Sequence, residues 1–411
     1  MCSFRNIVGL SVVLTAAAAF AQVQTNSVQT NSDQTNSVQA NSDFQPAKSG
    51  PIAYVYVSAS SGNGNPNSVV AYSAASNGAL TPIPGSPFSD NIYSMAVNGK
   101  YLMGASNESA DINAYAIGSD GSLSYSTSTD YAQYNNPGGP ECGAAGSIRF
   151  DHTGADLYVQ EFDGTEACAN DLIASFGVNE SNGSLNYLGD AVDGDFPGVF
   201  NPASIIGDDV YGYSADNDAC MYTAMYGFQR QSNGLLNNLN EQYSPPAPPP
   251  GVSTYIADLV AADPTNHLAV LEQPANPPGC APGAFKVASY TVDANGNLST
   301  KDTYKTMPTT VIQYYADMKM SPSGKLVAIA GGEGLQVFHF NGAKTLTHYT
   351  GLLTKESINQ MFWDNNNHLY AISNTAGKLL VFTITPTKHE RAPGSPYAIA
   401  GAQQIIVQPL K

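Results

Sequence analysis

A short phrase recurs six times along this chain of 411 residues and constrains its fold more than any other feature. Each copy has a strand-like segment with an aromatic residue, then Asn-Gly or Asp-Gly, and in most copies a leucine soon after. Because these dipeptides tolerate positive φ at both central positions of a tight hairpin turn, each copy predicts two antiparallel strands. Self-similarity at this spacing is typical of a repeat fold. The six turns are Asn77-Gly78, Asp120-Gly121, Asn182-Gly183, Asn233-Gly234, Asn295-Gly296 and Asn341-Gly342.

A further strand precedes each phrase, and this second series has seven members. Four short strands per repeat, rich in β-branched and aromatic residues and separated by Gly or Pro, are typical of a propeller blade. Residues 51–411 would then hold seven blades of roughly 52 residues each. The predicted fold is all-β, a seven-bladed β-propeller with four-stranded antiparallel blades. The segments of the second series are 53–57, 101–103, 156–159, 210–213, 268–271, 326–329 and 369–372.

The two ends of this region predict how the ring closes. The opening blade lacks its first strand, because the chain enters directly at 52–57. A spare strand at 404–408 follows the last blade. Pairing the spare strand with the first blade would remove both exposed sheet edges. We therefore expect the C-terminal strand to complete the first blade.

The residues before the repeats have the pattern of a secretory signal peptide followed by a polar spacer. Arg5 gives a positive start, residues 7–20 are apolar, and Ala19-Phe20-Ala21 supplies a small-x-small cleavage pattern. Residues 22–50 repeat Thr, Asn, Ser and Gln, a composition that cannot bury enough apolar surface to become ordered. The predicted domains are a signal peptide at 1–21, a disordered spacer at 22–50 and the propeller at 51–411. We expect a secreted or periplasmic protein, cleaved near Ala21.

The formal net charge of −17 excludes some classes of partner. An excess of carboxylates does not attract nucleic-acid phosphates or anionic lipids, so we expect neither as a partner. No segment after the predicted signal peptide is apolar for long enough to span a membrane. We expect a monomer whose ligand is a small molecule, a carbohydrate or a protein.

Four cysteines remain after the predicted cleavage, and an even number in a secreted chain is typical of two disulfides. In a four-stranded blade, the connection into the innermost strand and the connection between the middle strands share one face. All four cysteines fall in such connections and are expected on that face. Three connectivities are open, and we favour Cys142 with Cys168 within one blade and Cys220 with Cys280 across two. We interpret them as staples for long loops rather than as redox groups.

Charged residues in the predicted innermost strands are the candidate binding residues. Arg149, Asp258 and Asp317 lie near the start of these strands, with Tyr255 and Tyr315 beside them. A cation between two carboxylates suits an anionic or hydroxylated ligand, through charge-assisted hydrogen bonds and ring contacts. The alternative is a buried ion pair that fixes the ring. Catalytic residues remain unassigned.

Two acidic clusters raise the hypothesis of a calcium site. Calcium takes six or more oxygen ligands, and neither cluster has the full loop pattern with its Gly and terminal Glu. Solvated turns are the favoured interpretation, so no metal or cofactor is predicted. The clusters are Asp190, Asp193 and Asp195 in one loop, and Asp216, Asn217 and Asp218 in another.

Several phrases resemble the secreted branch of the lactonase-type propellers, also described as 6-phosphogluconolactonase-like or YVTN-like. They are the Tyr-Val-Tyr-Val strand at 54–57, the Asn-Gly-x-Leu turns, Ser-Pro-Ser-Gly at 321–324 and the Pro-Gly-Ser-Pro-aromatic phrases at 84–88 and 393–397. The resemblance covers the whole predicted propeller, and it implies lactone hydrolysis at the channel mouth. Active members place a His just ahead of an innermost strand, with Arg and Glu from neighbouring blades.

The stretch of this chain that corresponds to the family His is Gly-Ala-Ala-Gly at 143–146, so the His is not matched. The leading hypothesis is therefore a secreted module that binds a ligand or a protein through its disulfide-bearing loop face. The alternative hypothesis is an extracellular lactonase-like hydrolase, related to 6-phosphogluconolactonase, with its site at the mouth of the central channel.

Overall fold

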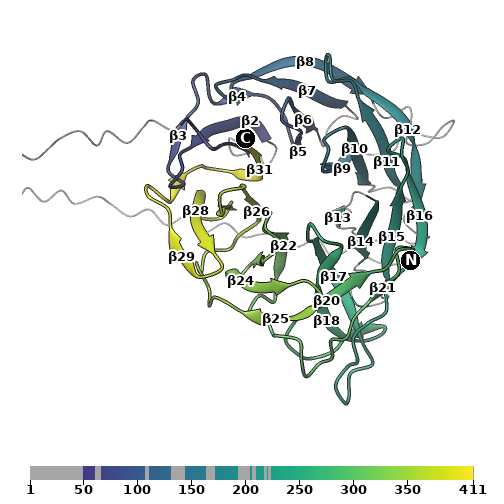
Figure 1. Cartoon of the computed structure of the whole chain (residues 1–411). Helices are drawn as coiled ribbons and strands as arrows, with labels where there is room; N and C mark the ends of the chain where they lie inside the picture. The colour runs from purple at the N-terminus through teal and green to yellow at the C-terminus, as the bar shows by residue number, and fades with distance from the viewer. Residues whose placement is uncertain are drawn as a thin grey trace, which may run out of the picture. The chain divides into compact units, whose positions relative to one another are not determined.

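The computed structural model describes residues 50–60, 66–106, 111–130, 144–162, 172–192, 204–205, 210–216, 220 and 224–410. The predicted signal peptide and most of the predicted spacer lie outside these described residues, so both remain predictions. The described strands form seven antiparallel sheets arranged in a ring, as Figure 1 shows. The predicted seven-bladed β-propeller is thus confirmed. Within the described ranges, no helix is long and apolar enough to cross a membrane.

Each blade has four strands that run outward from the channel. Blade 1 has a fifth short strand, β4, beside β2. From the innermost strand outward, the first three blades are β31 (Ala402–Pro409), β1 (Ala53–Ser60), β2 (Pro66–Ala74) and β3 (Leu80–Pro82), with β4 (Phe88–Ser89); β5 (Ser94–Val97), β6 (Tyr101–Ala105), β7 (Asp111–Ile117) and β8 (Leu123–Asp130); and β9 (Ala144–Phe150), β10 (Asp156–Phe162), β11 (Leu172–Val178) and β12 (Leu185–Val192).

The other four blades follow the same order, with short extra strands in blades 5 and 7. They are β13 (Ser204–Ile205), β14 (Tyr211–Asp216), β15 (Ala224–Arg230) and β16 (Leu236–Glu241); β17 (Thr254–Ala262), β18 (His267–Asn276), β20 (Lys286–Val292) and β21 (Leu298–Ser299), with β19 (Gly279–Cys280); β22 (Tyr315–Met320), β23 (Leu326–Gly331), β24 (Gly334–Asn341) and β25 (Lys344–His348); and β26 (Gln360–Trp363), β27 (His368–Ser373), β28 (Lys378–Thr385) and β29 (Lys388–Arg391), with β30 (Tyr397–Ala398).

The C-terminal strand closes the ring as the sequence predicts. β31 pairs antiparallel with β1, with Val55 opposite Val407 and Val57 opposite Ile405. β31 is therefore the innermost strand of blade 1, and both chain segments lie side by side there in Figure 1. This pairing gives β1 a hydrogen-bonded partner on both of its edges, so β1 has no open edge.

The hydrophobic core lies between the faces of adjacent blades. Val55 and Val57 of blade 1, for example, pack in one cluster with Tyr370 and Ile372 of blade 7, and all four are fully buried. Alternate residues of each middle strand face opposite neighbours, because successive side chains point to opposite sides of a strand. Each blade thus buries apolar side chains on both of its faces, which explains the nearly continuous apolar runs of the middle strands.

The turns between the third and outer strands differ in type from the prediction. Gly121 has φ of 84°, whereas the Asp before it does not have positive φ. Gly121 N donates to Gly118 O at 2.9 Å, and Gly118 N donates to Ser122 O at 2.8 Å. This pattern is a type I turn followed by a left-handed glycine, so the expectation of positive φ at both central residues is wrong. The Asp120 carboxylate instead accepts the Ser122 amide at 3.0 Å and caps the turn.

At four of the seven boundaries, these same turns lock a blade to the one before it. Tyrosines on the second strand of one blade donate their hydroxyls to carbonyls in the turn of the next blade. The bonds join Tyr56 to Gly121 at 2.9 Å, Tyr101 to Glu180 at 3.2 Å, Tyr158 to Gly234 at 3.0 Å and Tyr213 to Gly296 at 2.6 Å. We call these bonds the tyrosine–turn contacts.

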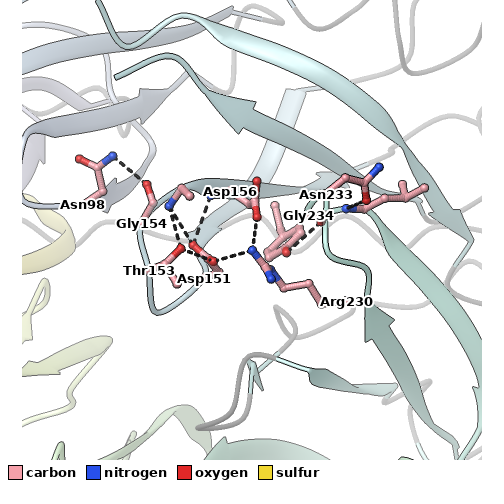
Figure 2. A network of polar contacts seen from close by, with 11 residues as sticks. Asn98, Asp151, Thr153, Gly154, Asp156, Arg230, Asn233 and Gly234 are labelled. Carbon is pink, nitrogen blue, oxygen red and sulfur yellow. Dashed lines mark hydrogen bonds and ion pairs between the residues drawn. The ribbon is translucent and has the colours of Figure 1, made fainter. Parts of the chain in front are cut away.

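An ion-pair network adds to the tyrosine–turn contact between blades 3 and 4. Figure 2 shows the Arg230 guanidinium between two carboxylates of blade 3, those of Asp151 and Asp156. The Arg230–Asp151 distance is 3.1 Å, and both carboxylates are almost fully buried. Asn98 of blade 2 donates to Gly154 O at 3.0 Å in the same view, so three blades are linked on this face.

A single methyl group tests how closely the turn of blade 2 packs against blade 1. A Cβ on Gly121 would lie 2.6 Å from the Tyr54 ring, whereas a Cβ on Gly251, which has nearly the same φ, meets nothing within 4 Å. Gly251→Ala is therefore expected to lower the free energy of unfolding by about 1 kcal/mol, through positive φ alone. Gly121→Ala is expected to lower it by about 3 kcal/mol, because overpacking adds to that strain. Urea unfolding of both variants checks this, and equal losses would contradict it.

Candidate functional site

Two of the five candidate residues are in contact, and two others are coupled by charge. The Tyr315 hydroxyl of blade 6 donates to Asp258 Oδ1 of blade 5 at 3.2 Å. Burial lowers the pKa of Arg149 in blade 3, and the charge of Asp317 in blade 6 partly opposes this effect. Because blades 3 and 6 are not neighbours, the charge of Asp317 acts on Arg149 across the centre of the ring.

Asp258 occupies an irregular position of the innermost strand β17. Ala257 pairs with Glu272 and Leu259 with Leu271, so Asp258 is the extra residue of a β-bulge. Bulges re-aim side chains and are common beside functional sites. The Asp258 side chain is fully buried, and burial raises its pKa to about 8, against the opposing effect of the Tyr315 hydroxyl.

One carboxylate oxygen of Asp317 pairs with a lysine, and the other accepts a hydrogen bond from the next blade. Its Oδ1 lies 2.8 Å from Lys319 Nζ, and its Oδ2 accepts the Met361 amide of β26 at 2.9 Å. Similar bonds tie other innermost strands, because Ile148 N donates to Ser94 Oγ at 3.1 Å. Asp317 therefore has a structural role in the ring as well as a charge at the channel.

Arg149 lies elsewhere along its strand than the sequence analysis expects. It is the sixth of seven residues of β9, near the end of the strand rather than its start. Its side chain is half-buried. Asp317 pairs with Lys319 at 2.8 Å, and its charge acts on Arg149 from another innermost strand. We call these three residues the channel cluster.

Tyr255 belongs to a different group, which the sequence analysis misses. It is buried in the core between blades 4 and 5, and burial, with a smaller effect of Glu272, raises its pKa to about 12. Glu272 is fully buried on β18 and accepts hydrogen bonds from the Tyr290 hydroxyl at 3.0 Å and from Tyr243. Burial raises its pKa to about 8, and the charge of Asp258 adds to this effect. The one sequence signal for this group is a carboxylate directly after the apolar run 268–271.

The structure confirms one of the two favoured disulfides. Cys220 and Cys280 are bonded, with their Cα atoms 5.0 Å apart, and they join the middle connections of blades 4 and 5. Cys142 and Cys168 lie outside the described residues, so their pairing stays a prediction. The bonded pair fixes two long loops on the face where all four cysteines are expected.

The calcium hypothesis is not supported within the described ranges. There, no group of three or more His, Cys, Asp or Glu side chains gathers in a way that can hold a metal ion. Asp193, Asp195, Asn217 and Asp218 lie outside the described residues, so neither cluster is described in full.

The histidines of the described ranges lie away from the innermost strands. His267 and His368 begin the second strands of blades 5 and 7, where each ring faces an aspartate four residues earlier. His368 Nδ1 lies 2.8 Å from Asp364 Oδ2, and the pair is buried. A Cβ on the turn glycine Gly78 would lie 2.9 Å from the His368 ring, so this histidine packs where tyrosines pack elsewhere.

The comparisons with known proteins show the fold. The sequence matches no family model, and no curated protein matches it. Among solved structures, a periplasmic gluconolactonase from Pseudomonas aeruginosa is 12% identical with a TM-score of 0.62, over 87% of this chain and 99% of that one. A proposed 6-phosphogluconolactonase from Bacteroides uniformis is 13% identical with a TM-score of 0.61, over 87% and 100%. The chain thus has the fold of the lactonase-like propellers.

The raised pKa of Glu272 predicts how stability depends on pH. A carboxyl that binds its proton more tightly in the folded chain contributes stability below its unfolded pKa, and this contribution is lost as pH rises toward about 8. Glu272→Gln mimics the protonated form. We expect the parent to lose roughly 4 kcal/mol more of its free energy of unfolding than this variant between pH 5 and pH 8.5.

Urea unfolding at the two pH values measures this difference. Glu390→Gln, on the exposed outer strand β29, is the matched control and should follow the parent. Parallel pH profiles for the parent and Glu272→Gln would show that Glu272 keeps an ordinary pKa in the folded chain.

Proposed function

We propose that this protein is an extracellular or periplasmic lactonase-like hydrolase that opens the lactone of a sugar acid at the central channel. The channel cluster carries the proposal, because two cations and a carboxylate come from innermost strands of two separate blades. Two solved structures with this fold are described as gluconolactonases, which supports the substrate class. The Cys220–Cys280 bond and the periplasmic location of one of these proteins are compatible with the proposed location.

Each member of the channel cluster has a role in this reaction. The oxygen of water forms a bond to the lactone carbonyl carbon, and negative charge develops on the carbonyl oxygen. Arg149 and Lys319 stabilise that charge, the usual function of fixed cationic donors in such sites. The Asp317 carboxylate takes the proton from water and returns it to the ring oxygen as the carbon–oxygen bond breaks. The product is the open hydroxy acid.

Asp258 acts through another residue in this proposal. It is fully buried and, with a pKa of about 8, largely protonated at neutral pH. Its hydrogen bond to Tyr315 fixes the first residue of β22, two positions before Asp317. Asp258 is therefore a positioning residue for the channel cluster.

Binding without hydrolysis is the second candidate function. The observation in its favour is that both carboxyls with strongly raised pKa, Asp258 and Glu272, are fully buried and out of reach of a substrate. The Cys220–Cys280 bond, which fixes loops of two adjacent blades, would then stabilise a binding face.

The test is the initial rate of opening of δ-gluconolactone and of 6-phosphogluconolactone by the purified protein. Arg149→Gln is expected to lower kcat/KM by about 100-fold, because one stabilising donor to the developing oxyanion is lost. Arg391→Gln is the matched control, because Arg391 lies on the exposed outer strand β29 over the Phe382 ring.

Each outcome separates the two candidate functions. If the parent protein opens neither lactone faster than buffer alone, the hydrolase proposal is wrong, and binding of gluconate by calorimetry tests the second candidate. If the parent is active and Arg149→Gln and Arg391→Gln are equally active, the channel cluster is not the site.

A further inference from the structure

A cavity of about 520 Å³ lies between the outer parts of blades 1 and 2, away from the innermost strands. This volume is in the range of small-ligand sites, about 300–1,000 Å³. In Figure 1, the short strand β4 of blade 1 lies beside β7 and β8 of blade 2, and residues of these strands form the walls. Its lining includes Phe88, Ser89, Asp90, Tyr115, Leu123 and Tyr125.

The boundary between blades 7 and 1 shows how the repeat fills the equivalent position. There, the Pro-Gly-Ser-Pro phrase ends in Tyr397, whose ring lies 6.0 Å from that of Tyr72. The Tyr397 hydroxyl accepts the Leu80 amide at 2.8 Å. At the boundary between blades 1 and 2, the same phrase ends in Phe88, which has no hydroxyl to offer.

The leucine amide after the turn is an available donor at this cavity. Corresponding leucines donate to a side-chain oxygen in two more blades, Leu185 to Thr129 and Leu236 to Ser175, both at 3.2 Å. Among the described residues, no side chain accepts the amide of Leu123, which lines the cavity.

Tyr115 contributes its ring to the cavity wall, whereas its hydroxyl is closed off from the cavity surface. Its side chain is more than nine-tenths buried, and within the described ranges its hydroxyl makes no hydrogen bond. Its ring meets that of Tyr125 edge to face, with centroids 6.0 Å apart.

The remaining walls combine aromatic surface with an acceptor. Tyr125 is 63% exposed, and Phe88 is half-buried beside it. The Asp90 carboxylate accepts the Asn91 amide at 2.7 Å and has further acceptor sites. Flat apolar rings together with a carboxylate suit a molecule that has C–H faces and many hydroxyl donors.

We propose that this cavity binds a neutral carbohydrate, independently of any reaction at the channel. The rings of Phe88 and Tyr125 contact the sugar face, Asp90 accepts its hydroxyls, and Leu123 N donates to one of its oxygens. A proline-rich peptide also favours aromatic grooves, but its prolines have no N–H donors for Asp90. An anionic ligand is disfavoured by Asp90 and by the net charge of −17.

The test is binding of cellotriose, maltotriose and mannotriose to the full chain, by calorimetry and saturation-transfer NMR. At least one trisaccharide is expected to bind, and Tyr125→Ala and Asp90→Asn are each expected to weaken it about ten-fold. Phe88→Tyr is expected to weaken binding as well, because its new hydroxyl can take the Leu123 amide as Tyr397 takes that of Leu80. Tyr314→Ala, at a tyrosine that is 78% exposed ahead of β22, is the control and should bind as the parent does.

Tyr115→Phe is a second control, at the cavity wall itself. Because the hydroxyl has no partner in the described part of the chain, its removal should leave the free energy of unfolding unchanged or raise it. The same variant should bind the trisaccharide as the parent does, because the hydroxyl is closed off from the cavity surface. The proposal is overturned if no trisaccharide binds, or if Tyr125→Ala and Phe88→Tyr bind as the parent does. It is also overturned if only a proline-rich peptide saturates the site, for which the probe is Pro-Pro-Ala-Pro-Pro-Pro, the sequence of residues 245–250 of this chain.

Discussion

The tyrosine–turn contact is the interaction on which the ring depends. A blade alone has two apolar faces and cannot bury either, so each needs a neighbour at a fixed angle. The glycine of each turn makes this approach feasible, because a Cβ at Gly121 or Gly296 would collide with a tyrosine ring of the preceding blade. The tyrosine hydroxyl then satisfies a turn carbonyl that blade packing would otherwise leave unpaired. One repeated phrase therefore sets both the hairpin and the joint between blades.

Charge is distributed unevenly over this scaffold. On the turn face, Arg230 is held between Asp151 and Asp156, which is a joint between blades rather than a site. At the channel, Asp317 shares its carboxylate between Lys319 and a backbone amide of the next blade. Asp317 thus joins two blades and also carries charge at the channel. In the proposed hydrolase, the catalytic carboxylate is one that the ring already holds in place.

The sequence predicts the blades well because their signals are local. Turn glycines, strands rich in β-branched and aromatic residues, and the unpaired strands at the two ends are sufficient for seven blades and their closure, and the structure confirms both. The hydrogen bond between Tyr315 and Asp258 depends on a β-bulge, and no local sequence pattern predicts this bulge. Glu272 escapes prediction for a similar reason, since its tyrosine partners are distant in sequence. The turn type was predicted wrongly because Asn-Gly also occurs in a type I turn with a left-handed glycine.

Closure by β31 has a consequence for how the chain reaches this state. The innermost strand of blade 1 pairs with residues separated from it by most of the propeller sequence, Ala53 opposite Pro409. Contacts of such separation carry a large loop-closure entropy and are typical of slow folding. Intermediate blades can form local hairpins early, but the ring cannot close until its last strand is available. During that interval β1 presents an unpaired inner edge, so the order of synthesis leaves the first blade as the last to be completed.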